Sequence, residues 1–121
     1  MSKRNDKEFL GDIKEAVRRI REYTENINYK DFLNDIKTQD AVVRNFEVIG
    51  EAVKNLSINL RETHSKIPWK KIAGIKDKLI HHYFGVNFEI LWTIIEEDLP
   101  DLDTQIKDIL NEKKNIMGDK L

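Results

Sequence analysis

Residues 38–60 read TQDAVVRNFEVIGEAVKNLSINL, and this stretch decides the fold. Its apolar side chains recur every three to four residues, the spacing that gathers them on one face of an α-helix. The members of this stripe are Ala41, Val42, Phe46, Val48, Ile49, Ala52, Val53 and Leu56. A face this wide needs more than one neighbouring helix to cover it, and Gly50 beside it permits close approach. Thr38 is the expected N-cap of this helix, which should run to about Leu60.

The same periodicity continues on both sides of this segment and predicts helices throughout the chain. A first helix is expected from about Asp6 to Asn26, followed by a polar connection near residues 29–37 whose Phe32 and Leu33 reach the core. Pro68 suits the first turn of a third helix that ends near Gly85. Asn87 should cap a fourth helix, and Pro100 should bend or restart the chain before a last amphipathic helix. The apolar positions expected inside these helices are Phe9, Leu10, Ile13, Val17, Ile20, Ile27, Trp69, Ile72, Ala73, Leu79, Ile80, Tyr83, Ile90, Leu91, Trp92, Ile94, Ile95, Leu102, Ile106, Ile109 and Leu110.

These patterns predict an all-α fold, an antiparallel bundle of four to five helices. Five Gly and two Pro in 121 residues leave little turn chemistry for a β-sheet. The length suits one domain spanning residues 1–121, with a tail that frays from about residue 113.

Composition excludes several classes of protein. There is no cysteine, so disulfides, thiolate zinc sites and cysteine nucleophiles are ruled out. The net charge of −1 argues against a broad nucleic-acid-coating surface, although a small phosphate-handling site needs only a local cluster of cations. We find no apolar run of signal-peptide or transmembrane type, and therefore expect a cytoplasmic protein without membrane association.

The segment KDKLIHHY, residues 76–83, places polar groups on an otherwise apolar helix. Lys76 lies four residues after Ile72 and four before Ile80, so it falls on the apolar stripe and must snorkel, pair with a carboxylate, or face a cleft or partner subunit. Asp77 and His81 are spaced i, i+4 and can touch, which would fix the imidazole tautomer and raise its pKa.

Lys76 and His81 differ by about 140° of helical rotation and do not share a face. They can still converge through the long lysine stem, through a helix end that relaxes near Tyr83, or by pooling of residues across a two-fold interface. A histidine and a cation suit transfer of an RNA phosphate to its own 2′-OH, with the histidine moving protons and the cation stabilising charge on phosphate. No metal or cofactor is required when the nucleophile is already in the substrate.

The chain resembles the HEPN superfamily, and specifically the HepT-like toxins of toxin–antitoxin pairs. Three segments carry the resemblance, namely residues 44–52 (RNFEVIGEA), Ile67-Pro68-Trp69, and residues 76–83, and Leu91-Trp92 and Asp98-Leu99-Pro100 also fit. The family signature is an arginine, a polar residue, a spacer, a histidine, one residue and a tyrosine. Lys76, Asp77, His81 and Tyr83 occupy these positions here.

The resemblance implies a helical-bundle homodimer with a metal-independent ribonuclease site at the dimer cleft. It also implies a partner, a minimal nucleotidyltransferase antitoxin that in some systems attaches AMP to the motif tyrosine, here Tyr83. Arg44 and Glu51 match a second family segment, for which we expect a structural or site-supporting role. No cofactor or metal site is implied.

Lys76 departs from the family pattern, because lysine keeps the charge but loses the planar fork with which arginine grips phosphate. A non-catalytic HEPN partner of a nucleotidyltransferase is therefore a second hypothesis, and a helical dimer serving assembly alone is a third. Lys76 could instead form a structural ion pair with Glu47 or Glu51. His81 could be a core or cap histidine, and Tyr83 a residue at the edge of the core.

Overall fold

The computed structural model describes the backbone of residues 4–79 and 87–119, and the side chains of these residues except 76, 78, 79 and 113–119. Within these ranges the chain is helical and contains no strand, which confirms the all-α prediction. In chain order the elements are α1 (Asp6–Thr24), α2 (Tyr29–Leu33), α3 (Ile36–Asn55), α4 (Ile58–Thr63), α5 (Trp69–Leu79), α6 (Phe88–Thr93), the π-helix η1 (Ile94–Asp98) and α7 (Leu99–Asp119).

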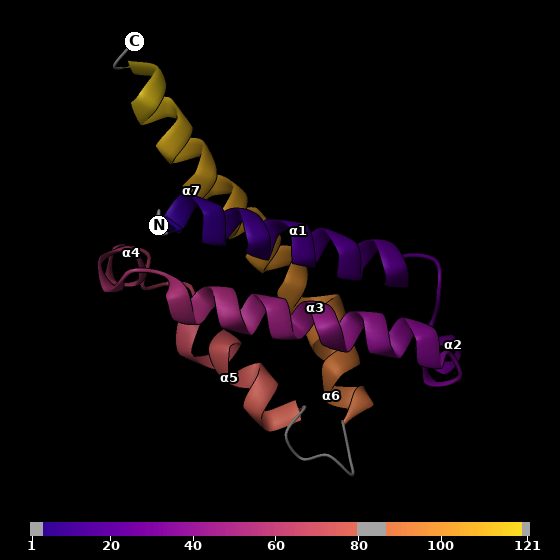
Figure 1. Ribbon diagram of the computed structural model, residues 1–121. Coiled ribbons are helices and arrows are strands. Elements are labelled where there is room, and N and C mark those ends of the chain that lie inside the picture. Colours follow the sequence, from indigo (N-terminus) through magenta and orange to yellow (C-terminus); the bar gives the residue numbers. More distant parts are fainter. Residues whose placement is uncertain (1–3, 80–86, 120–121) are drawn as a thin grey trace.

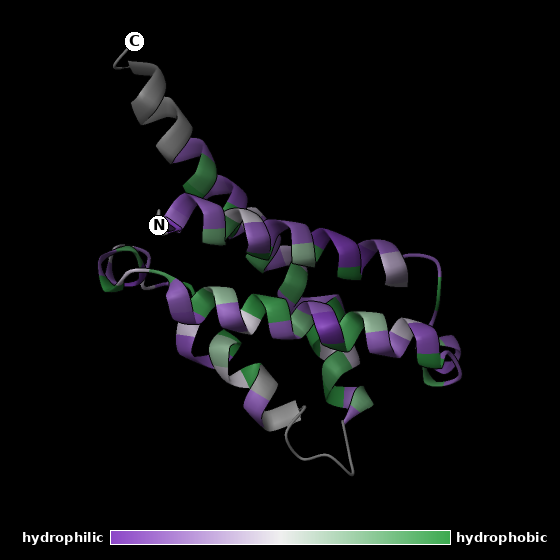
Figure 2. Ribbon diagram, in the orientation of Figure 1, coloured by the Kyte–Doolittle hydropathy of each residue, from purple (hydrophilic) through white to green (hydrophobic). Residues whose placement is uncertain are grey.

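Helix α3 is the centre of the bundle, as its wide apolar face predicts. It runs antiparallel to α1, packs against α5 on another side, and α7 crosses the α1–α3 pair (Figure 1). Val42 and Val53 are fully buried, and Phe46 and Ile49 are 1% exposed. Figure 2 shows the hydrophobic positions of α1, α3 and α5 gathered on their facing sides, with polar positions outside. Burial of these stripes provides the main driving force for folding.

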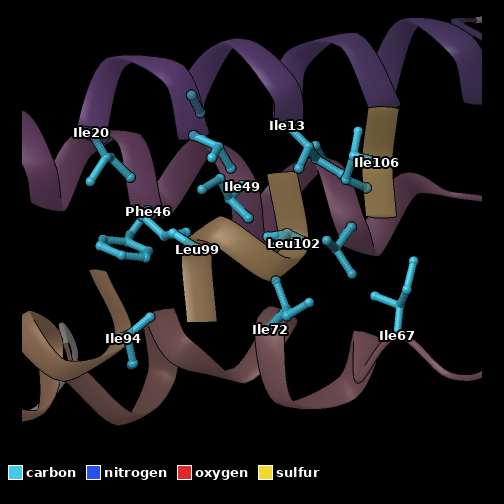
Figure 3. Packing of buried hydrophobic residues seen from close by; sticks show 14 of the residues in the cluster. Ile13, Ile20, Phe46, Ile49, Ile67, Ile72, Ile94, Leu99, Leu102 and Ile106 are labelled. Carbon is cyan, nitrogen blue, oxygen red and sulfur yellow. The ribbon is translucent and has the colours of Figure 1, made fainter. Parts of the chain in front are cut away.

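The core forms where α1, α3, α5 and α7 meet. Ile13 of α1, Ile49 of α3, Ile72 of α5 and Leu102 of α7 all point into the shared interior (Figure 3). Each of these side chains is at most 8% exposed, as is Ile106 on α7. The four amphipathic stripes predicted from the sequence are therefore confirmed as one hydrophobic core.

The boundaries of α3 differ from the sequence prediction at both ends. Asp35, not Thr38, is the N-cap: its carboxylate accepts the Thr38 backbone N–H at 3.1 Å and the Thr38 hydroxyl at 2.6 Å. The helix ends at Asn55 rather than near Leu60, because Leu56 is extended and Ser57 caps a separate helix, α4. Asp6 of α1 accepts hydrogen bonds from the Ser57 backbone N–H and hydroxyl, at 2.8 and 2.6 Å, which fixes this break.

Two apolar residues expected in the core are on the surface. Phe32 is fully buried, but its neighbour Leu33 is 43% exposed, since α2 is one short helical turn with a single inward position. Ile90 is 49% exposed, because the inward face of α6 is centred on Leu91, which is fully buried.

Pro100 coincides with a change of helix type, as expected for a residue that cannot continue a regular helix. The Leu99 N–H donates to the Ile94 carbonyl five residues earlier, the hydrogen bond of a π-helix. The wider turn relieves the clash that a proline ring makes with the carbonyl four residues before it. Among the described helices, none combines the length and apolar composition needed to cross a bilayer.

Candidate functional site

The helix that leads into the predicted motif, α5, is anchored firmly at its start. Pro68 precedes it, and the Ile72 N–H donates to the Pro68 carbonyl at 3.0 Å. Trp69 is 6% exposed, and its indole N–H donates to the His64 carbonyl at 3.1 Å. Trp69 is thus buried, as the apolar pattern predicts, and it fixes the first turn of α5 against the α4–α5 connection.

The motif begins in the last turns of α5. Lys76 belongs to this helix, one turn after the buried Ile72, and Asp77 follows with an exposed side chain. His81 and Tyr83 lie outside the described residues, as does the expected helix end near Gly85. The contact between Asp77 and His81, the convergence of Lys76 with His81, and the alternative pairing of Lys76 with α3 therefore remain predictions.

The second family segment lies on the exposed side of α3. The Arg44 side chain is 73% exposed, and its guanidinium lies 3.8 Å from the Glu47 carboxylate. Glu51 is exposed one turn further along the helix. Arg44, Glu47 and Glu51 thus form a polar row along α3. Neither Arg44 nor Glu51 lines the groove or the cavity described next.

An open groove of about 1190 Å³ lies between α4 and α5 and extends to the end of α3. We name it the α4–α5 groove. Its lining residues are Lys54, Ile58, Arg61, Glu62, Ser65, Ile67, Pro68, Trp69, Lys70, Lys71, Ala73, Gly74 and Asp77. Asp77 is the motif residue in this set, so the groove reaches the end of α5 that carries the motif. A smaller cavity, between α3, α5 and α7, has a volume of about 140 Å³, below that of a typical ligand site.

The sequence interpretation missed the four cations of this groove, Lys54, Arg61, Lys70 and Lys71. Read singly they look like ordinary solvated residues. The sequence feature that could have revealed these cations is the excess of positive charge in the segment that contains them. Within the described part of the chain, no three His, Asp or Glu side chains are grouped as a metal site would require.

Comparison with known proteins decides the family. The family model described as "Ribonuclease HepT-like" matches residues 13–109, which include all three segments that carry the predicted resemblance. The chain belongs to the ribonuclease HepT-like family. The sequence resemblance to HepT-like proteins of the HEPN superfamily is therefore confirmed.

Several curated relatives of this HepT-like chain align over most of their length. "Putative RNase TTE0752" of Caldanaerobacter subterraneus is 52% identical over 93 residues, covering 77% of this chain and 83% of that protein. "Putative RNase MJ0127" of Methanocaldococcus jannaschii is 44% identical over 119 residues, covering 95% and 98%. "Probable ribonuclease HepT" of Thermococcus cleftensis is 49% identical over 100 residues, covering 83% and 91%. No solved structure matches the chain.

Proposed function

We propose that this HepT-like chain is an endoribonuclease toxin that cleaves RNA by attack of the 2′-OH on the adjacent phosphate. The match to the ribonuclease HepT-like family across residues 13–109, with the motif inside it, carries the proposal. The names of its relatives as ribonucleases support the same reaction class.

His81 is the proposed acid–base residue. It accepts the proton of the 2′-OH as the 2′-oxygen bonds to phosphorus, and a protonated histidine then supplies a proton to the departing 5′-oxygen. The products are a 2′,3′-cyclic phosphate and a 5′-hydroxyl, so no outside nucleophile or metal is consumed. Lys76 stabilises the negative charge that grows on the phosphate, and Asp77 orients the imidazole.

We propose that the site is completed by a second copy of the chain. Lys76 and His81 differ by about 140° of rotation on a continuous helix, and a two-fold axis beside the motif would bring them together from opposite protomers. Arg44 and Glu51 would support the cleft. A cognate minimal nucleotidyltransferase would act as the antitoxin, with Tyr83 as its AMP acceptor. We further propose that this toxin acts on RNA in the cytoplasm. The chain would form a single HEPN domain.

The decisive experiment compares RNA cleavage by the wild type and His81→Ala, with tRNA and mRNA as substrates and EDTA present throughout. His64→Ala is the matched control, because this histidine lies in the α4–α5 connection, beside Glu112 rather than in the motif. We expect cleavage by the wild type and the control, with 2′,3′-cyclic phosphate ends, and none by His81→Ala. Equal cleavage by wild type and His81→Ala, or no cleavage by either, removes the proposal.

The presence of lysine at the arginine position favours one alternative, a non-catalytic HEPN partner of a nucleotidyltransferase. Lys76→Arg tests it, because arginine restores the bidentate grip on phosphate without changing the charge. Cleavage by Lys76→Arg alone would identify the natural chain as the non-catalytic partner. Intact mass after co-expression with a neighbouring nucleotidyltransferase gene would reveal an added AMP, and Tyr83→Phe should abolish the addition.

A further inference from the structure

Charge is strongly segregated along this nearly neutral chain. Residues 54–79 contain seven Lys and Arg against two Asp and Glu, a net charge of +5, and the remainder of the chain therefore carries −6. This segment comprises the end of α3, then α4, α5 and their connection (Figure 1), the elements that flank the α4–α5 groove. Such a local excess of cations attracts a polyanion even when the whole protein is slightly acidic.

Four of these cations converge on the groove from three different helices. Lys54 comes from the end of α3, Arg61 from α4, and Lys70 and Lys71 from the first turn of α5. Lys70, Gly74 and Asp77 follow one another at intervals of four and three residues, so the groove runs along one face of α5. His81 lies four residues beyond Asp77 in the sequence, and the groove therefore leads toward the motif.

These cations differ from the arginines of the opposite side of the bundle. In α1, Arg18, Arg19 and Arg21 are each within 3.2 Å of a carboxylate. Within the described residues, none of the four groove cations forms an ion pair. Arg61 in addition holds its Nε enclosed, with no hydrogen-bond acceptor among those residues. An enclosed N–H without an acceptor is costly, so the Arg61 side chain gains when its guanidinium turns outward to an external anion.

The surface between the cations is largely apolar. Ile58 is 67% exposed although it lies in the groove, and Pro68, Trp69 and Ala73 contribute to the same lining. A double-stranded nucleic acid presents mainly phosphates and sugars on its outside, so its bases could not contact the apolar residues of the groove. Single-stranded RNA presents both phosphates and open base faces, which suits a cationic groove with apolar walls.

We propose that the α4–α5 groove binds the single-stranded RNA segment that flanks the cleaved phosphate. This inference rests on the proposed ribonuclease function and adds the path of the substrate. Lys54, Lys70 and Lys71 bind backbone phosphates, Arg61 turns its guanidinium to one of them, and Ile58 contacts the bases. The open space at Gly74, where an added Cβ meets nothing within 4 Å, is part of the channel in which the strand lies.

Gly74→Glu is the sharpest test, because it places a carboxylate in the channel at a position where an added Cβ meets no atom within 4 Å. Gly11→Glu is the matched control, since Gly11 is also an interior glycine of a helix, an added Cβ there likewise meets nothing within 4 Å, and Gly11 does not line the groove. Lys70→Gln with Lys71→Gln removes two groove charges. Its control, Lys30→Gln with Lys37→Gln, removes two exposed charges at the opposite end of α3.

Binding is measured by fluorescence anisotropy with a labelled single-stranded RNA, every variant being built on His81→Ala to prevent cleavage. We expect Gly74→Glu and the Lys70–Lys71 pair to weaken binding, the pair by roughly two- to fivefold for each lysine removed. The logarithmic salt slope should fall by about 0.7 for each lost phosphate contact. The Gly11 and Lys30–Lys37 controls should retain the parent affinity.

Measurements of RNA binding and of RNA cleavage together distinguish the failure of this inference from the failure of the proposed function. Weaker binding by the groove variants alone supports the inference when the wild type cleaves RNA. If the wild type does not cleave, the same result still places RNA in the groove, and what fails is the proposed ribonuclease function. Equal effects in groove and control variants, tighter binding of duplex than of single strand, or no RNA binding at all would overturn it. It is also overturned if the groove variants keep RNA affinity and instead alter the oligomeric state or nucleotidyltransferase binding, which would identify the groove as a protein interface.

Discussion

Replacing Phe32 by alanine should be the most damaging change to the part of the bundle beside α6. Phe32 is fully buried and is the one buried residue of α2. Its ring lies edge-on to Phe88, with centroids 5.7 Å apart, and 5.1 Å from the ring of Trp92. Helix α2 has five residues and no independent stability, so this aromatic contact holds α2 to α6.

The expected loss is about 3–5 kcal/mol of unfolding free energy, the usual cost of removing a buried phenylalanine with its cavity. This is a large part of the roughly 5–15 kcal/mol that stabilises a typical domain. Urea unfolding followed by tryptophan fluorescence measures it directly, because Trp92 belongs to the same cluster. All variants must be compared at one protein concentration, since association would add to the apparent stability.

Leu33→Ala is the control, because Leu33 is the next residue and is 43% exposed. It should cost less than about 1 kcal/mol. Phe32→Leu, which keeps most of the buried volume, should fall between the two. If Phe32→Ala lost less than about 1.5 kcal/mol, or no more than Leu33→Ala, the packing argument for α2 would be wrong.

Three further changes test local features of the helices. Ser57→Ala removes the cap of α4 and the 2.6 Å hydroxyl bond to Asp6, and should lower the unfolding free energy by about 1–2 kcal/mol; an unchanged urea midpoint would contradict the role assigned to this break. Gly11→Ala should raise stability by about 0.5–1 kcal/mol, because the helix gains propensity and the added methyl meets no atom; a lower melting temperature would show strain at this position. Hydrogen bonds from the Thr38 hydroxyl and N–H lower the pKa of Asp35 below its ordinary 3.8, so its stabilising effect is complete above that pH and is lost as pH falls through the lowered value. Asp35→Asn should therefore show a shallower acid loss of melting temperature than the wild type, and parallel curves would refute this.

The sequence was sufficient for the fold class because helical stripes are local patterns. The stripe from Leu10 to Ile20 and the stripe from Val42 to Val53 are each visible in one segment, and both are buried as predicted. The break between α3 and α4 was not predictable in the same way. It depends on Asp6, which is 51 residues from Ser57 in the sequence and becomes its partner only after α1 packs beside α3.

The N-terminus of α3 illustrates a second limit of prediction from the sequence. Asp35 and Thr38 are both good capping residues, and each could begin the helix in isolation. The structure selects Asp35 because its carboxylate accepts hydrogen bonds from both the backbone N–H and the hydroxyl of Thr38, so Thr38 supports the cap instead of being it.

The candidate site shows the same division between local pattern and folded arrangement. The motif from Lys76 to Tyr83 is contiguous, so the sequence alone pointed to the family. The cations of the α4–α5 groove come from three helices, and only their packing brings Lys54 near Lys70. A net charge near zero concealed this groove, because the carboxylates that balance it are carried elsewhere in the chain.

Lys76 and the groove cations should act on different kinetic parameters, and this follows from where each meets the RNA. Flanking phosphates keep the same charge in the ground state and the transition state, so groove contacts stabilise both equally and Gly74→Glu should raise KM with little change in kcat. Charge changes only at the reacting phosphate, where the fork of an arginine matters most. Lys76→Arg should therefore change kcat and leave KM close to that of the wild type. If Lys76→Arg changed KM alone, Lys76 would belong to the binding groove, and the cation at the reacting phosphate would have to be sought elsewhere.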